Sequence, residues 1–199
     1  MRTLLLVLLV VAPRMSLALV PDPPRTTYVF GKIGVVIPES DDLRAFDNGF
    51  ALEAGVGFRF AKHFAVEGSI GNFKTSFTQS VVDPALGSFT NTGNLNATPV
   101  LATLKLFGRS SIFELFAAAG VGVYFVSFTG TVNSVAGVSS QSGSDTRFGY
   151  HLGGGLSVFL SPQLAVGGEV KYVLANASLL GQTSSINSLL VTATAGYAF

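Results

Sequence analysis

The chain has 199 residues, a formal net charge of +1 and no cysteine, and only 12% of its residues are charged, against roughly 25% in soluble domains. The absence of cysteine excludes a disulfide framework, a zinc–thiolate site and a lipoprotein anchor on an amino-terminal cysteine. No basic stripe indicates a nucleic-acid partner, and no metal-ligand spacing, phosphate loop or nucleophile motif predicts a cofactor.

The amino terminus has the pattern of an export signal. A short basic start precedes an apolar run from Leu4 to Ala12, which is shorter than the roughly 20 apolar residues of a spanning helix. Small residues at Ser16 and Ala18 occupy the positions that signal peptidase reads. We therefore expect a signal peptide over residues 1–18, cleaved after Ala18, with a membrane-anchor helix as the alternative. A proline-rich leader over residues 19–27 follows, and proline is excluded from sheet interiors.

The rest of the chain alternates with a period of two, which predicts β-strands. The clearest example has one apolar face, made by Phe50, Leu52, Ala54, Val56, Phe58 and Phe60. In chain order, the predicted strands cover residues 28–37, 50–60, 64–73, 98–107, 112–125, 146–160, 164–174 and 186–199.

The connections alternate in length. Tight turns are predicted at residues 61–63, 108–111 and 161–163, and long polar loops at 38–49, 74–97, 126–145 and 175–185. The polar tracts 91–96 and 139–144 predict flexible solvated loops, with a binding surface as the alternative. Phe77, Phe89 and Phe128 near the loop bases are interpreted either as girdle aromatics or as part of a contact site.

The two strand faces differ in a way that separates a membrane barrel from a soluble one. A soluble barrel of the lipocalin type buries its apolar face and exposes charges. Here glycines and scattered charges share one face, which suits the narrow lumen of eight strands, while the larger apolar residues suit lipid. Aromatics on the apolar face fall at two levels, as in the girdles of membrane barrels: Phe60, Phe64, Phe113, Tyr197 and Phe199 near the short turns, and Phe50, Phe125, Phe148 and Tyr150 near the long loops. The prediction is an all-β fold, an eight-stranded antiparallel up-and-down transmembrane β-barrel over residues 28–199.

Residues 116–124, 148–155 and the last strand, ending at Phe199, resemble the small outer-membrane barrels of the OmpA-transmembrane-domain, OmpX and OmpW class. The resemblance covers about residues 28–199 and implies a place in the outer membrane of a Gram-negative bacterium, in contact with its lipid and lipopolysaccharide. It also implies short turns on the periplasmic side, and assembly by the outer-membrane insertion machinery through a terminal signal that includes Tyr197 and Phe199.

Ionisable residues on the predicted lumen face are nearly balanced in sign. They are Lys32, Glu53, Arg59, Glu67, Lys105, Glu114, Arg147, His151, Glu169 and Lys171. Because an unpaired buried charge is costly, we expect a network of paired charges that fills a closed lumen. A gated polar pathway and an enzymatic site are the alternatives.

The pattern of residues around His151 argues against an enzyme. The barrel lipid A deacylases resemble a His-x-Ser pattern, which residues 151–153 lack. Ser157 follows His151 by six residues on one strand, too far for a hydrogen bond at about 3.3 Å per residue. A lipid A-modifying enzyme is therefore the least favoured alternative, and no cofactor is expected.

The predicted role is structural or surface-interacting, through long extracellular loops with a possible surface partner. The main alternative is an OmpW-like conduit for small hydrophobic molecules, which needs an apolar upper lumen and a lateral exit. Leu101, Phe116 and Leu190 are predicted to point inward, but the many inward charges favour a plugged pore.

Overall fold

The computed structural model describes residues 27–39, 46–83, 87–110, 112–134, 137–179, 182–185 and 187–199. The strands in this part of the chain are β1 (Thr27–Pro38), β2 (Gly49–Ala61), β3 (Phe64–Asp83), β4 (Gly87–Ser110), β5 (Phe113–Ser134), β6 (Gly137–Phe159), β7 (Leu164–Leu179), β8 (Gln182–Ser185) and β9 (Ser188–Ala198). Within the same residues, no helix is long and apolar enough to cross a membrane. The predicted signal peptide, its cleavage site at Ala18 and most of the leader lie outside the described residues.

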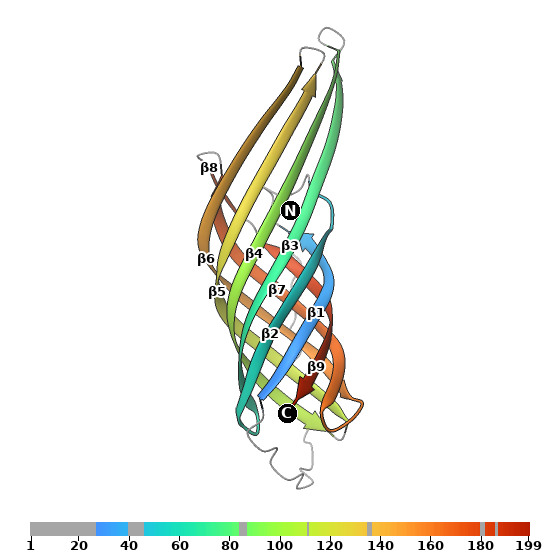
Figure 1. Ribbon diagram of the computed structural model, residues 1–199, viewed down its shortest axis with the longest axis vertical. Coiled ribbons are helices and arrows are strands. Elements are labelled where there is room, and N and C mark those ends of the chain that lie inside the picture. Colours follow the sequence, from blue (N-terminus) through green and yellow to red (C-terminus); the bar gives the residue numbers. More distant parts are fainter. Residues whose placement is uncertain are drawn as a thin grey trace, which may run out of the picture.

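Eight of these strands close into a ring (Figure 1). The order β6-β5-β4-β3-β2-β1-β9-β7 is closed by pairing between β6 and β7, and every pair is antiparallel. The short β8 pairs only with the upper end of β7. The backbone nitrogen of Phe199 donates a hydrogen bond to the carbonyl of Thr27 at 3.0 Å, so β1 begins beside the end of β9. The predicted eight-stranded up-and-down barrel is confirmed.

The prediction of long loops at residues 74–97 and 126–145 is wrong. β3 and β4 remain paired as far as Asp83 and Gly87, and β5 and β6 as far as Ser134 and Gly137. The polar tracts 91–96 and 139–144 therefore lie in strands. The predicted loop at 175–185 is also partly strand, because β7 extends to Leu179 and β8 follows it. The polar sequence of these segments led to the wrong prediction. A strand with water on both faces needs no apolar face, because hydrogen bonds to the neighbouring strand satisfy its backbone groups.

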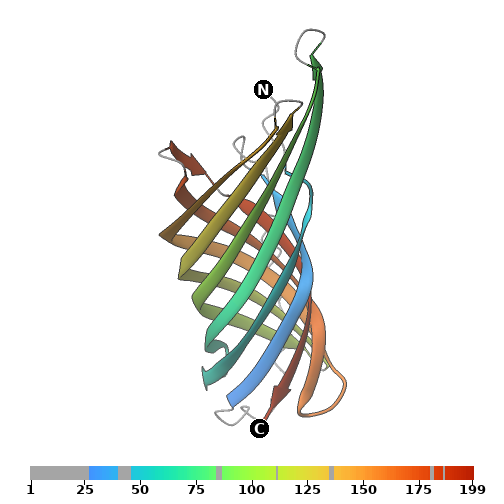
Figure 2. The same cartoon turned by 45° about the horizontal axis from the view of Figure 1, so that its top comes forward.

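Four strands consequently rise above the ring on one side (Figures 1 and 2). We call this part the protruding sheet: residues 75–83 of β3, 87–97 of β4, 126–134 of β5 and 137–148 of β6. The remaining strands of the ring end lower, so the upper rim of the barrel is much higher on the side of β3–β6 than on the opposite side. In the predicted loop at 38–49, residues 40–45 lie outside the described residues.

The faces of the ring point as the alternation predicts. Large apolar side chains such as Ile70, Leu104 and Leu152 are exposed on the outer wall, while the charged residues of the other face are buried. Both predicted sets of girdle aromatics lie on the exposed outer face. This is the arrangement of a barrel whose surroundings are apolar, since an exposed apolar belt of this size is unfavourable in water.

Candidate functional site in the lumen

Six buried charged side chains cross the middle of the lumen. They come from five strands, three are positive and three negative, and none of the six residues is more than 6% exposed. We call them the charge belt: Lys32, Glu53, Glu67, Lys105, Glu169 and Lys171. Each occupies the inward position of its strand, because the residues on either side point to the outer wall.

The upper part of the belt is a continuous set of ion pairs. Lys32 Nζ lies 2.9 Å from Glu53 Oε1 and 3.0 Å from Glu169 Oε2. Lys171 Nζ lies 2.6 Å from Glu53 Oε2 and 3.5 Å from Glu169 Oε1. Ser69 Oγ also donates to Glu53 Oε1 at 3.0 Å. Each carboxylate therefore contacts more than one ammonium group, which compensates for the loss of water around the buried charges.

The lower part of the belt joins a second group of ions. Lys105 Nζ lies 2.9 Å from Glu67 Oε1 and 3.5 Å from Glu169 Oε2. Nearer the short turns, Arg59 donates to the Glu114 carboxylate through both terminal guanidinium nitrogens, Nη1 at 2.8 Å and Nη2 at 2.6 Å. The guanidinium carbon of Arg59 also lies 4.2 Å from the centre of the Phe107 ring. These charges are paired before any ligand arrives.

Arg147 does not join the buried charges, although the sequence pattern predicts it in the lumen. Its side chain is 44% exposed, and its Nε lies 2.8 Å from Asp145 Oδ2. The reason is its place on β6: residue 147 lies two positions above Gly149, where pairing with β7 begins, and so at the upper rim of the ring.

His151 is buried beside the belt, and its partner is a residue that the sequence pattern did not single out. Its Nε2 lies 2.9 Å from Thr103 Oγ1, while its Nδ1 has no hydrogen-bond partner. In a catalytic hydroxyl–histidine pair a third group commonly orients the ring; in the part of the chain that the structure describes, Nδ1 makes no hydrogen bond to such a group. The sequence does contain a signal for Thr103: it lies two residues before Lys105 and therefore on the same, inward face of the strand. In the described residues no group of three or more histidine, aspartate and glutamate side chains is placed to hold a metal ion.

Two of the aromatic rings that point into the lumen are those of Phe30 and Phe116, and the inward direction of Phe116 is the predicted one. Each is seated over a glycine of a neighbouring strand. A Cβ built on Gly55 would lie 2.7 Å from Phe30 Cζ, and one on Gly155 would lie 2.6 Å from Phe116 Cζ. The inward glycines thus leave space for the aromatic rings of neighbouring strands inside the narrow lumen.

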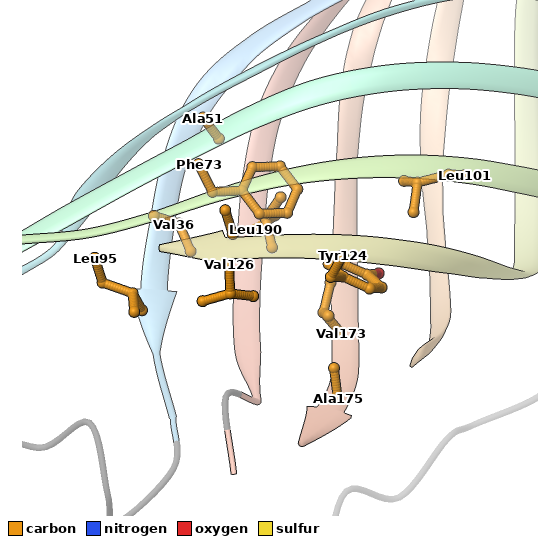
Figure 3. Packing of buried hydrophobic residues seen from close by; sticks show 11 residues of the cluster. Val36, Ala51, Phe73, Leu95, Leu101, Tyr124, Val126, Val173, Ala175 and Leu190 are labelled. Atoms are coloured by element: carbon orange, nitrogen blue, oxygen red, sulfur yellow. The ribbon is translucent and has the colours of Figure 1, made fainter. Parts of the chain in front are cut away.

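Above the belt the lumen is filled by an apolar group, the upper cluster (Figure 3). Its buried members are Val36, Ala51, Phe73, Leu95, Ala97, Leu101, Tyr124, Val126, Val173, Ala175 and Leu190. A void of about 30 Å³ lies among them. Phe46 and Phe128 pack against this cluster, and the Phe46 and Phe77 ring centres lie 4.9 Å apart. Phe77 and Phe128 are therefore not lipid-girdle residues, and the side chain of Phe89 lies outside the described residues.

Below the belt lies a larger space, which we call the lower cavity. It has a volume of about 450 Å³, and its wall combines aromatic rings, including Tyr28, Phe30, Phe107, Phe116 and Phe159, with charged side chains such as Lys105 and Arg109. Turn residues Pro162 and Gln163 and the terminal Phe199 border it, so the cavity reaches the short-turn rim. From the short turns upward, the lumen therefore contains an aromatic cavity, a belt of ion pairs and an apolar cluster.

Residues 3–199 match the family model described as the outer membrane protein beta-barrel domain. The chain belongs to this family. This outer-membrane barrel accordingly resides in the bacterial outer membrane, among its lipids.

Solved structures share the fold of this outer-membrane barrel at low sequence identity. Neisserial surface protein A is 12% identical, with a TM-score of 0.60 over 87% of this chain and 97% of that one. OprG from Pseudomonas aeruginosa is 15% identical, with a TM-score of 0.58 over 88% and 96%. A major outer membrane protein from Thermus thermophilus is 17% identical, with a TM-score of 0.55 over 89% and 100%. No curated protein matches the chain.

Proposed function

We propose that this outer-membrane barrel is a non-catalytic protein with a closed lumen, and that it has a structural and surface-interacting role carried out by the protruding sheet. The observation that carries the proposal is the open edge of β6, which stands clear of the ring above a lumen filled with side chains. We further propose that the short turns face the periplasm, that the amino-terminal signal is removed after Ala18, and that the insertion machinery reads Tyr197 and Phe199. The outward aromatics then contact lipid and lipopolysaccharide at the two interfaces.

The contents of the lumen favour a closed barrel. A polar solute would have to pass the belt, where each ammonium group already lies within 3.0 Å of a carboxylate oxygen. It would then meet the upper cluster, where the void lined by Val36, Phe73 and Tyr124 measures about 30 Å³. Passage would require breaking buried ion pairs and displacing packed apolar side chains together.

The two edges of the protruding sheet differ. On the β3 side, the segment before β2 covers the first residues: the Asp47 backbone nitrogen donates to the Ser76 carbonyl at 3.0 Å, and Thr75 Oγ1 donates to the Asp47 carbonyl. On the β6 side, pairing with β7 begins only at Gly149, and residues 138–144 have no further strand beside them in the described part of the chain. The β3 edge is therefore covered at its base, while residues 77–83 of β3 and 138–144 of β6 have no further strand beside them in the described residues.

The β6 edge also lacks the features that usually prevent strand addition. Natural edge strands carry lysine, proline or inward charges that block pairing with another chain. Residues 138–144, Val-Ser-Ser-Gln-Ser-Gly-Ser, contain neither charge nor proline. An extended peptide segment of a surface partner could add to this edge through main-chain hydrogen bonds, with the short polar side chains permitting close approach.

Shortening the β5–β6 hairpin tests the proposed surface role. Phe128 and Gly143 are paired across these strands, so residues 129–142 can be replaced by an Asn-Gly turn without changing the register below. We expect a barrel that still inserts and still migrates as a folded species, but adhesion of cells displaying it to protein-coated surfaces should fall at least fivefold. The matched control shortens the β3–β4 hairpin between the partners Phe77 and Gly93 and leaves the β6 edge intact. Full adhesion after removal of the β6 edge would refute this role.

A conduit for small hydrophobic molecules remains the second candidate, because the upper cluster supplies an apolar upper lumen, as OmpW-like transport would need. Single-channel recording in planar bilayers separates the two. We expect no steady discrete openings from the wild-type barrel at neutral pH, since both belt and cluster close the path. Reproducible unit conductance steps would favour a conducting lumen over a closed one.

A further inference from the structure

The lower cavity has features of a ligand site that the surface role of the protein does not use. Its volume of about 450 Å³ falls in the range of roughly 300–1,000 Å³ typical of small-molecule pockets. Aromatic rings from β1, β4, β5 and β6 line it, and it opens at the short-turn rim, opposite the protruding sheet. The charge belt separates it from the upper cluster, so a molecule entering there would bind rather than pass through.

The charges of the cavity wall restrict what could bind. Every buried charge in this wall already has a partner of opposite sign: Arg59 pairs with Glu114, Lys105 with Glu67, and Lys32 with Glu53 and Glu169. Bringing a further net charge into this poorly hydrated space would leave it uncompensated. Arg109, at the exposed end of the wall, stacks on Phe159, with its guanidinium carbon 4.2 Å from the ring centre. The buried part of the wall therefore favours a neutral ligand.

One polar atom of the wall is unused. Glu67 is 5% exposed; its Oε1 accepts a hydrogen bond from Tyr28 at 2.7 Å and lies 2.9 Å from Lys105 Nζ. Its Oε2 is buried without a hydrogen-bond partner. This oxygen is covered in the structure, so the Glu67 side chain must turn slightly toward the cavity to meet a ligand. A buried carboxylate oxygen without a donor is costly, so a ligand that brings one donor to it gains more than a ligand without it.

We propose that the lower cavity binds a small, neutral aromatic molecule that carries one hydrogen-bond donor, with the donor on Glu67 Oε2 and the ring among Phe30, Phe107 and Phe116. Aromatic pairs favour edge-to-face and offset contacts, which a wall built from several strands can offer. This site is independent of the surface role: it uses the opposite rim and none of the residues of the protruding sheet.

Indole and 1-methylindole are a matched pair of probes, since the methyl group removes the donor and keeps the ring. The chain contains no tryptophan, so indole fluorescence excited beyond the tyrosine band reports on the probe. We titrate each probe into the folded barrel in detergent and subtract the signal of empty micelles. We expect saturable binding of one indole per barrel, and about two- to tenfold weaker binding of 1-methylindole, the factor that one net hydrogen bond contributes.

Two variants locate the site. Thr194 lines the cavity from β9, so Thr194→Phe should fill it and weaken indole binding at least tenfold. The control Val191→Phe adds the same ring to the same strand on the outer wall, where Val191 is exposed, and should leave binding unchanged. Glu67→Gln should place its amide nitrogen where Oε2 lay, because Tyr28 and Lys105 require an acceptor at the other position. The preference for indole over 1-methylindole should then disappear.

Each outcome decides the proposal. Equal affinity of the wild-type barrel for the two probes would remove the role of Glu67, and unchanged indole binding by Thr194→Phe would remove the cavity as the site. Partition into detergent alone would give a non-saturable signal, identical in the wild type and in Thr194→Phe, and would also overturn the proposal. Heat-modifiable migration on gels checks that each variant is folded. If Glu67→Gln does not fold, the probe pair and Thr194→Phe still decide.

Discussion

Replacing Glu53 with glutamine is expected to destabilise the folded barrel by about 3–5 kcal/mol, the usual cost of removing one partner of a buried ion pair. Glu53 accepts contacts from Lys32, Lys171 and Ser69, all in the lumen. Without its charge, Lys171 keeps only the longer contact to Glu169, at 3.5 Å. The free energy of unfolding, measured by urea titration in lipid vesicles, checks this value.

Two controls separate charge imbalance from loss of packing. The double variant Glu53→Gln with Lys171→Met restores the balance of the belt, and should cost less than the sum of the two single changes. Asp145→Asn removes a carboxylate whose partner Arg147 is substantially exposed, and should cost about 1 kcal/mol or less. Strict additivity of the two belt substitutions would mean that the ions of the belt do not stabilise one another.

The variant Leu104→Arg is expected to cost about 2–4 kcal/mol, as arginine does at the lipid-facing midplane of a barrel. Leu104 is 48% exposed on the outer wall and pairs with Ala119, midway along β5 between the outward aromatics Phe113 and Phe125. A guanidinium there would face hydrocarbon. Unfolding in lipid vesicles again measures the change in free energy.

The matched control is Val132→Arg. Val132 is 43% exposed, close to the value for Leu104, but lies on β5 in the protruding sheet. The same substitution in water should change stability by no more than about 0.5 kcal/mol. Equal costs at the two positions would show that exposure alone, and not contact with lipid, sets the effect.

The ring could be predicted from sequence because a buried lumen and an apolar exterior impose a period of two. The predicted ends of the first two strands, at 28–37 and 50–60, differ by one residue from β1 and β2. The protruding sheet could not be recognised in the same way. Once a strand leaves the membrane, both of its faces contact water, and a tract such as 139–144 has the composition of a loop although each of its residues pairs in register with β5.

The site was predictable in part. Alternation identified the inward charges, but not their partners, because these depend on how strands meet across the lumen: Lys32 and Glu169 are 137 positions apart in the chain. Alternation also predicted the inward direction of Phe116, but not how its ring and that of Phe30 are accommodated in the lumen. Their rings occupy space left by glycines on neighbouring strands, and only the register between strands shows that match.

The continuity of β3 to β6 from one rim to the hairpin ends has a mechanical consequence. β4 alone has 24 residues, which at roughly 3.3 Å per residue is about 80 Å of unbroken strand. A pull on the tip of the sheet along its strands would load many ladder hydrogen bonds at once, in shear, and would transfer the force directly to the wall held by lipid. A flexible loop would stretch first and transmit little. The protruding sheet is therefore a stiff extension of the barrel wall, which holds a partner bound at its edge at a fixed height and orientation above the membrane.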